Sequence, residues 1–124
     1  MIYLDTHVVI WLYAARPDLL SDKACKRIEE SAIIVSPIVL LELDYLREIG
    51  RIADRGKTVY QNLHTRIGLK LCNRPFLEII ESASKQSWTR DPFDRIIVGH
   101  AVAANEELVT RDEEIQQHYS RAIW

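Results

Sequence analysis

Short apolar runs alternate with longer amphipathic stretches along the whole chain. Each run has about four residues and contains many aliphatic side chains, which predicts buried strands. The expected strands are residues 2–5, 32–35, 69–72 and 107–110. A further apolar tail, residues 122–124, is suited to add a strand at one edge of a sheet.

The stretches between these runs carry the signals of helices. We expect helices over residues 8–14, 22–30, 37–49, 51–68 with a break at Gly56, 76–86, 92–104 and 113–118. Ser36 and Asp91 occupy N-cap positions, and Pro37 and Pro92 are suited to the first helical turn. Strands that alternate with helices predict an α/β protein whose parallel sheet is covered by helices on both faces.

Composition limits the class of protein. The 124 residues suit one domain, and no linker, repeat or low-complexity tract divides them. No apolar run approaches the ~18–20 residues needed to cross a bilayer, and the first residues lack the features of a signal peptide. We therefore expect a cytoplasmic protein with reduced thiols at Cys25 and Cys72. A net charge of −2 argues against strong non-specific nucleic-acid binding, but it allows a basic rim around an acidic pocket.

Two aspartates follow predicted strands directly. Asp5 ends the first strand and precedes a helix, so its simplest interpretation in isolation is a helix N-cap. Asp112 follows the fourth strand in a similar way. In a parallel sheet the carboxyl ends of the strands share one edge, where functional sites form. We therefore expect Asp5 and Asp112 at the same edge.

Two further acids lie on apolar faces of predicted helices. Glu42 is four residues from both Ile38 and Leu46. It lies inside an apolar stripe that is predicted to face inward and comprises Ile38, Leu41, Tyr45, Leu46 and Ile49. Asp94 lies three residues before Ile97, although the helix dipole alone is a sufficient reason for an acid in a first turn. Buried carboxylates need partners. The pattern therefore predicts that four acids from four elements converge.

Clustered carboxylates either take up protons or bind a cation. Mg²⁺ and Mn²⁺ prefer such oxygen ligands. A bound metal of this kind activates water and stabilises charge on a phosphoryl oxygen, so phosphodiester hydrolysis fits the pattern. Thr6 and Thr110 are suited to orient carboxylates or waters, but ordinary turn or strand structure explains both threonines equally well.

Four stretches of the chain carry a resemblance to a known family. They are Tyr3-Leu4-Asp5-Thr6-His7 with the apolar run to Trp11, Ser36-Pro37 through Leu41-Glu42-Leu43, Arg90-Asp91-Pro92-Phe93-Asp94-Arg95 with Ile96 to Ala101, and Leu108-Val109-Thr110-Arg111-Asp112. In this order, with their acids 37, 52 and 18 residues apart, they resemble PIN-domain ribonucleases, and closely the toxins of VapC-type toxin–antitoxin pairs. The resemblance implies one PIN domain over residues 1–124. It also implies a three-layer α/β/α sandwich with a central, mostly parallel sheet of four to five strands.

The resemblance also implies a site and partners. The Mg²⁺- or Mn²⁺-binding catalytic residues would be Asp5, Glu42, Asp94 and Asp112. An endoribonuclease toxin of this type implies an RNA substrate, a cognate antitoxin protein and a homodimer. Arg90, Arg95 and Arg111 adjoin these acids in sequence and are candidates for RNA contact, because guanidinium groups suit phosphate geometry. We expect Asp91 to act mainly as a helix cap and His7 to lie in packing or at the rim.

Other functions remain open. A PIN nuclease of RNA processing would need no antitoxin, although a compact chain without a further RNA-binding domain favours the toxin. A phosphoacceptor signalling domain would need a lysine after a late strand, and no lysine follows Lys85. A non-catalytic acidic interaction module is disfavoured by the presence of all four acids. Arg47, Arg51 and Arg55 would form a basic stripe for phosphate contact if helix continued through them, or otherwise a solvated surface.

Overall fold

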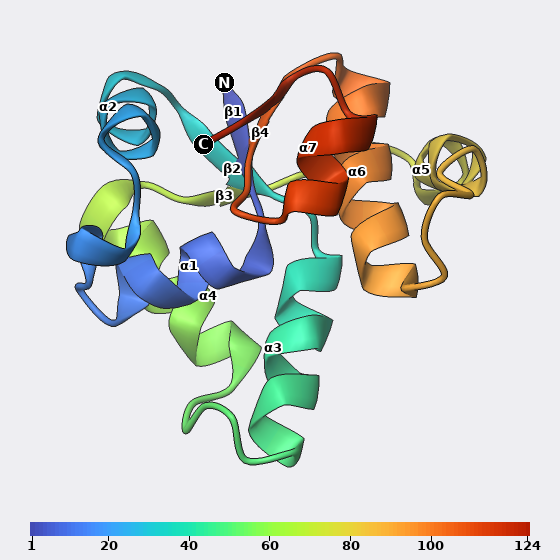
Figure 1. The fold of residues 1–124 in the computed structure, drawn as a ribbon. Coiled ribbons are helices and arrows are strands. Elements are labelled where there is room, and N and C mark those ends of the chain that lie inside the picture. The colour runs from blue at the N-terminus through green and yellow to red at the C-terminus, as the bar shows by residue number, and fades with distance from the viewer.

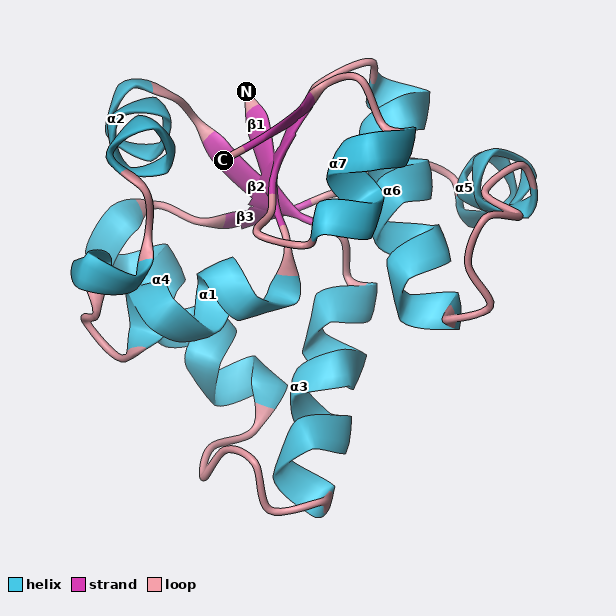
Figure 2. Cartoon of the chain, in the orientation of Figure 1, coloured by secondary structure: helices cyan, strands magenta, loops and turns pink.

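Five short strands form one parallel sheet in the computed structural model, which describes all 124 residues. Their order across the sheet is β3-β2-β1-β4-β5, and every neighbouring pair is parallel. The strands are β1 Ile2–Leu4, β2 Ile33–Val35, β3 Lys70–Leu71, β4 Glu107–Val109 and β5 Ala122–Ile123. The apolar tail therefore does form an edge strand, and the predicted α/β class is confirmed (Figure 2).

Seven α-helices connect and cover these strands. They are α1 Thr6–Tyr13, α2 Asp22–Glu30, α3 Ile38–Glu48, α4 Gly56–Ile67, α5 Phe76–Ser84, α6 Pro92–Ala104 and α7 Glu113–His118, with a 3₁₀ turn at Pro17–Leu19. Crossovers between parallel strands are right-handed, and the chain reverses its direction across the sheet after β3. Helices α1, α2 and α4 therefore lie on one side and α5–α7 on the other (Figure 1). No helix has the length and apolar character that a membrane crossing would require.

Helix α3 contains the clearest difference from the predicted pattern. The stripe containing Leu41, Tyr45 and Ile49 was predicted to face inward, but these side chains are 55%, 46% and 50% exposed. Val39 and Leu43 are buried instead. The helix is apolar on two faces, and only the Val39–Leu43 face meets the core between α4 and α6. The other apolar face is left at the surface.

The connection between α3 and α4 also differs from the prediction. Gly50 adopts a left-handed φ of +78° just beyond α3, and α4 begins only at Gly56. Asp44 accepts a hydrogen bond from the Gly56 N–H at 2.8 Å, so a side chain of α3 caps α4. A Cβ at Gly56 would lie 2.3 Å from the carbonyl oxygen of Leu40, which explains the glycine. Helix does not continue through Arg47, Arg51 and Arg55, so these exposed residues form no helical stripe, in agreement with the alternative of a solvated surface.

Candidate active site

The carboxyl ends of β1 and β4 form the floor of a cavity of about 470 Å³. Leu4 pairs with Val109 in the sheet, so the next residues on the two strands, Asp5 and Thr110, become neighbours. The Asp5 N–H donates to the Val109 carbonyl at 3.0 Å, and the Thr110 hydroxyl donates to Asp5 Oδ2 at 2.6 Å. Strand register therefore positions the first predicted acid.

Asp5 is both a helix cap and a wall of the cavity. Its Oδ1 accepts the Thr6 N–H at 2.8 Å, so α1 begins at Thr6, two residues earlier than predicted. The side chain is 8% exposed. Burial raises the pKa of Asp5, while the hydrogen bonds from Thr110 and Thr6 act in the opposite direction. The two sequence interpretations of this residue are thus compatible.

Glu42 reaches the cavity from α3. The Thr6 hydroxyl donates a hydrogen bond to Glu42 Oε1, which links α1 to α3 beside the cavity. Burial raises the pKa of Glu42, the Thr6 bond opposes this rise, and the negative charges of Asp5 and Asp91 add to it. The glutamate is therefore held in place while its ionised form stays unfavourable.

Asp94 enters the cavity from the first turn of α6, and its carboxylate accepts no hydrogen bond from the protein. Asp91 is the N-cap of this helix, as predicted, because it accepts the N–H groups of Phe93 at 2.9 Å and Asp94 at 3.4 Å. Burial and, to a smaller extent, the negative charges of Asp91, Asp5, Asp112 and Glu42 together raise the pKa of Asp94 to about 8. Asp94 is therefore the acid whose negative charge receives the least stabilisation from protein groups.

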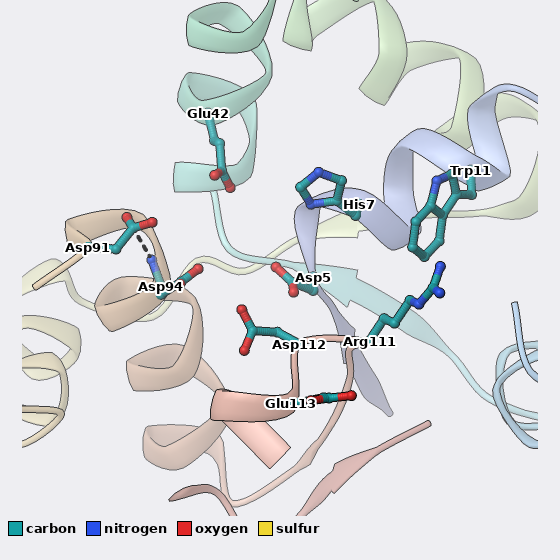
Figure 3. Close-up of a pocket in the computed structure, with 9 residues that line it drawn as sticks. All are labelled: Asp5, His7, Trp11, Glu42, Asp91, Asp94, Arg111, Asp112 and Glu113. Atoms are coloured by element: carbon teal, nitrogen blue, oxygen red, sulfur yellow. Dashed lines mark hydrogen bonds between the residues drawn. The ribbon is translucent and has the colours of Figure 1, made fainter. Parts of the chain in front are cut away.

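Asp112 completes the set from the segment after β4. It caps α7 by accepting the Ile115 N–H at 3.0 Å, and its own N–H donates to the Thr110 hydroxyl at 3.0 Å. Thr110 thereby links the Asp112 backbone to the Asp5 carboxylate. The four predicted acids point toward a common space (Figure 3), although no three of them stand close enough to hold an ion directly between them.

Among the predicted arginines, only Arg111 lines this cavity. Its Cζ lies 6.0 Å from the ring centroid of Trp11, and its side chain makes no hydrogen bond or ion pair. Arg90 and Arg95 instead donate to backbone carbonyls of the segment before α6 and lie outside the cavity. Sequence proximity to the acids therefore did not bring these two side chains into the site.

The model of the PIN domain family matches residues 2–120 of the chain. The chain belongs to the PIN-domain family. This PIN domain is also similar to a curated protein, "Ribonuclease VapC22" of Mycobacterium tuberculosis (strain ATCC 25618 / H37Rv). The two are 32% identical over 123 residues, which cover 94% of this chain and 91% of that protein.

Solved structures share the PIN fold. The crystal structure of VapBC2 from Rickettsia felis, bound to a DNA fragment from their promoter, matches with a TM-score of 0.69 and 21% identity. That match covers 100% of this chain and 98% of the other. A toxin–antitoxin complex from Klebsiella pneumoniae matches with a TM-score of 0.66 and 17% identity, over 100% and 97% of the two chains. These likenesses confirm the predicted PIN-like sandwich.

The donor set of this PIN domain fits a hard divalent cation. All four candidate ligands are carboxylates, and mutual repulsion and burial make an opposite charge favourable among them. Mg²⁺ keeps several of its waters when it binds proteins, so ligands spread around a cavity are compatible with it. The role of these acids as ligands remains a prediction.

The PIN domain also presents cavity residues that the motifs did not identify as functional. Trp11 and Glu113 line the cavity, and exposed His7 lies at its rim as expected. His7 and Trp11 are four residues apart, so they share one side of α1, and their ring centroids are 6.0 Å apart. The sequence signal for these two cavity residues was therefore a pair of rings four positions apart, directly after Asp5.

Proposed function

We propose that this PIN domain is a Mg²⁺- or Mn²⁺-dependent endoribonuclease. The observation that carries the proposal is the uncompensated Asp94 carboxylate, which accepts no hydrogen bond and whose pKa is raised to about 8 among other acids. Buried ionised carboxylates are costly without a partner of opposite charge. A divalent cation would supply that charge.

The residues that line the cavity would have separate roles in metal binding and RNA binding. Asp94 and Asp112 would hold the ion together with Asp5 and Glu42, in part through waters that the ion keeps, while Thr110 and Thr6 keep the latter two carboxylates oriented. When bound, a divalent ion supplies an activated water and positive charge for the phosphoryl oxygens. Arg111, the one arginine at the cavity, would hold a backbone phosphate through its free N–H groups.

Cleavage of single-stranded RNA tests this activity. We expect cleavage with Mn²⁺, none with excess EDTA, and at least about a 100-fold loss in Asp94→Asn, because even residues behind a metal ligand typically contribute 10–100-fold. Glu81→Gln is the matched control, since Glu81 is exposed and makes no hydrogen bond or ion pair. Equal cleavage by Asp94→Asn and the native chain would overturn the proposal and favour a non-catalytic acidic module.

The proposal extends to a growth-inhibiting toxin with a protein antitoxin. It is supported by similarity to a protein named Ribonuclease VapC22 and by structural neighbours whose descriptions name toxin–antitoxin complexes. An RNA-cleaving toxin acts where RNA is translated, so the proposal places the chain in the cytoplasm. Induction should arrest growth, and co-expression of the neighbouring open reading frame should relieve the arrest. Unrelieved arrest, or no arrest despite RNA cleavage, would favour RNA processing without an antitoxin.

A homodimer is the last part of the proposal. Several apolar side chains of α3 and α5, and of the residue that follows α3, are exposed; they are Leu41, Tyr45, Ile49, Phe76, Leu77 and Ile80. Two of them, Leu41 and Phe76, line a groove of about 360 Å³. A patch of this kind is typical of an interface. Sedimentation should show a dimer that Leu77→Glu dissociates and Ile67→Glu, an exposed apolar control on α4, does not. A native monomer would exclude this arrangement.

A further inference from the structure

One tryptophan, Trp11, lines the cavity that contains the acids. Of the nine residues that line the cavity, eight are charged or titratable and only Trp11 is apolar. Trp11 is half-buried on α1, and two neighbouring rings fix its position. The centroid of Trp124 lies 5.9 Å away and that of His7 lies 6.0 Å away. The indole therefore presents a positioned aromatic surface to an otherwise charged cavity (Figure 3).

Packing accounts for the position of the Trp11 ring but not for its indole N–H. The Trp11 indole N–H donates to no protein group, whereas the Trp88 indole N–H donates to Gln86 at 2.9 Å. The Trp11 N–H is open to solvent, since no buried side-chain nitrogen of the chain lacks a partner. An indole that is held in place, open to a cavity and free at its donor is suited to a ligand that offers both a flat face and an acceptor.

The spacing between Trp11 and Arg111 suits a flat ligand. The guanidinium carbon lies 6.0 Å from the ring centroid, whereas direct contact between planar groups needs roughly 3.5–4 Å. Stacked bases are separated by about 3.4 Å, so a base between two planar groups holds them roughly 7 Å apart. The exposed Arg111 side chain makes no hydrogen bond or ion pair, so an outward movement of about 1 Å gives up only its approach to the Trp11 ring, which a stacked base would replace.

We propose that Trp11, with Arg111 facing it and His7 beside it, forms a subsite for one unpaired nucleobase adjoining the acidic centre. The inference rests on the proposed function only in taking RNA as the ligand. Every base has a π-face, and stacking on an aromatic side chain contributes about 1–3 kcal/mol per base. Bases are available for such stacking in single strands, loops and ends rather than within duplexes.

Charge favours a base over a phosphate next to the indole. The cavity contains Asp5, Glu42, Asp91, Asp94, Asp112 and Glu113, which repel the phosphates of RNA. A neutral base is free of this repulsion, and Arg111 is placed to bind the phosphate attached to the same nucleotide. The subsite would thus fix the register of the strand so that a neighbouring phosphodiester bond reaches the acids.

Binding measurements test the subsite separately from cleavage. Short fluorescent ribo-oligonucleotides, in which each position in turn is abasic, are titrated with Asp94→Asn protein in Mn²⁺. One abasic position should weaken binding about 5- to 150-fold, the range that corresponds to stacking of one base. Trp11→Leu should weaken binding of the intact oligonucleotide by a similar factor, and the abasic position should then cause no further loss.

Controls separate stacking from a structural role. Trp11→Phe retains an aromatic face and should recover most of the affinity, while Trp88→Leu, the same change outside the cavity, should leave affinity unchanged. Melting curves show whether each variant is folded. Equal losses at every abasic position, additive losses with Trp11→Leu, or no RNA binding would each overturn the subsite. Absence of Mn²⁺-dependent cleavage by the native protein would instead refute the proposed activity, whether or not a base binds.

Discussion

Replacement of Asp94 by asparagine should stabilise the metal-free protein above neutral pH. In the folded chain, burial and neighbouring carboxylates raise the pKa of Asp94 from 3.8 to about 8, so the folded state retains a proton that the unfolded state releases. Stability from this group is fully present below about pH 4 and is lost as the pH rises through about 8. Asparagine keeps the shape and carries no charge at any of these pH values.

The size of the effect follows from that pKa, after allowance for solvent. Ionising a group whose pKa rises from 3.8 to about 8 costs about 6 kcal/mol in principle. Asp94 is only half-buried and faces an open cavity, so water screens much of this cost. We expect a net gain of about 2 kcal/mol for Asp94→Asn at pH 8–9. For 124 residues this corresponds to a rise in Tm of about 8 °C.

Urea unfolding in EDTA at pH 4 to 9 measures the difference. The two proteins should agree near pH 4 and diverge progressively above it. The free energy of unfolding should still depend on pH in both proteins, because burial also raises the pKa values of Asp5 and Glu42. Glu81→Gln should follow the native curve, since that side chain lies on the exposed surface of α5.

Metal provides the complementary measurement. Mn²⁺ at 100 times its dissociation constant should stabilise the native chain by about 2.7 kcal/mol, because it binds only the folded state. The gain should be much smaller in Asp94→Asn. If Asp94→Asn is less stable than the native chain at pH 8 in EDTA, the Asp94 carboxylate has a stabilising partner. The claim that burial and repulsion between the acids destabilise its ionised form would then be wrong.

Variants at three further positions test individual contacts by urea unfolding. Thr110→Val removes the hydroxyl that donates to Asp5 and should cost about 1–3 kcal/mol, whereas Thr110→Ser should cost much less; equal losses would contradict a role for the hydroxyl. Asp91→Ala should lose about 1 kcal/mol of N-cap stabilisation. Asp91→Asn keeps the cap and relieves the repulsion between acids in EDTA, so it should be at least as stable as the native chain. Gly56→Ala should lose about 1–3 kcal/mol, because its Cβ would overlap the Leu40 carbonyl; an unchanged midpoint would mean that α3 and α4 separate easily.

Local signals in the chain predicted most of the elements. Apolar runs of about four residues became strands, and the cap Asp91 began its helix where expected. Chain order together with the right-handed crossover rule then determines which helices cover each face. The prediction failed where helix propensity continued through residues 51–55, because the break there depends on a tertiary contact, the bond from Gly56 to Asp44.

The sequence predicted that these four acids would come together, as they do around one cavity, but it did not predict their surroundings. Asp5 and Asp112 follow strands that a parallel sheet brings to one edge, so their approach follows from topology. The hydrogen bonds of Thr110 and Thr6, and the absence of any bond to Asp94, depend on side-chain positions across different elements. These contacts join segments more than 30 residues apart, and no local pattern encodes them.

The order of strands and helices, the parallel sheet and the convergence of the four acids on one cavity therefore follow from signals along the chain. Only the tertiary structure decided which face of α3 is buried, which arginine reaches the acids, and that Trp11 lines their cavity. Periodicity records how apolar side chains repeat along one element. The buried face and the direction of a charged side chain depend instead on which neighbouring elements offer contact, and that is set only when all of them pack together.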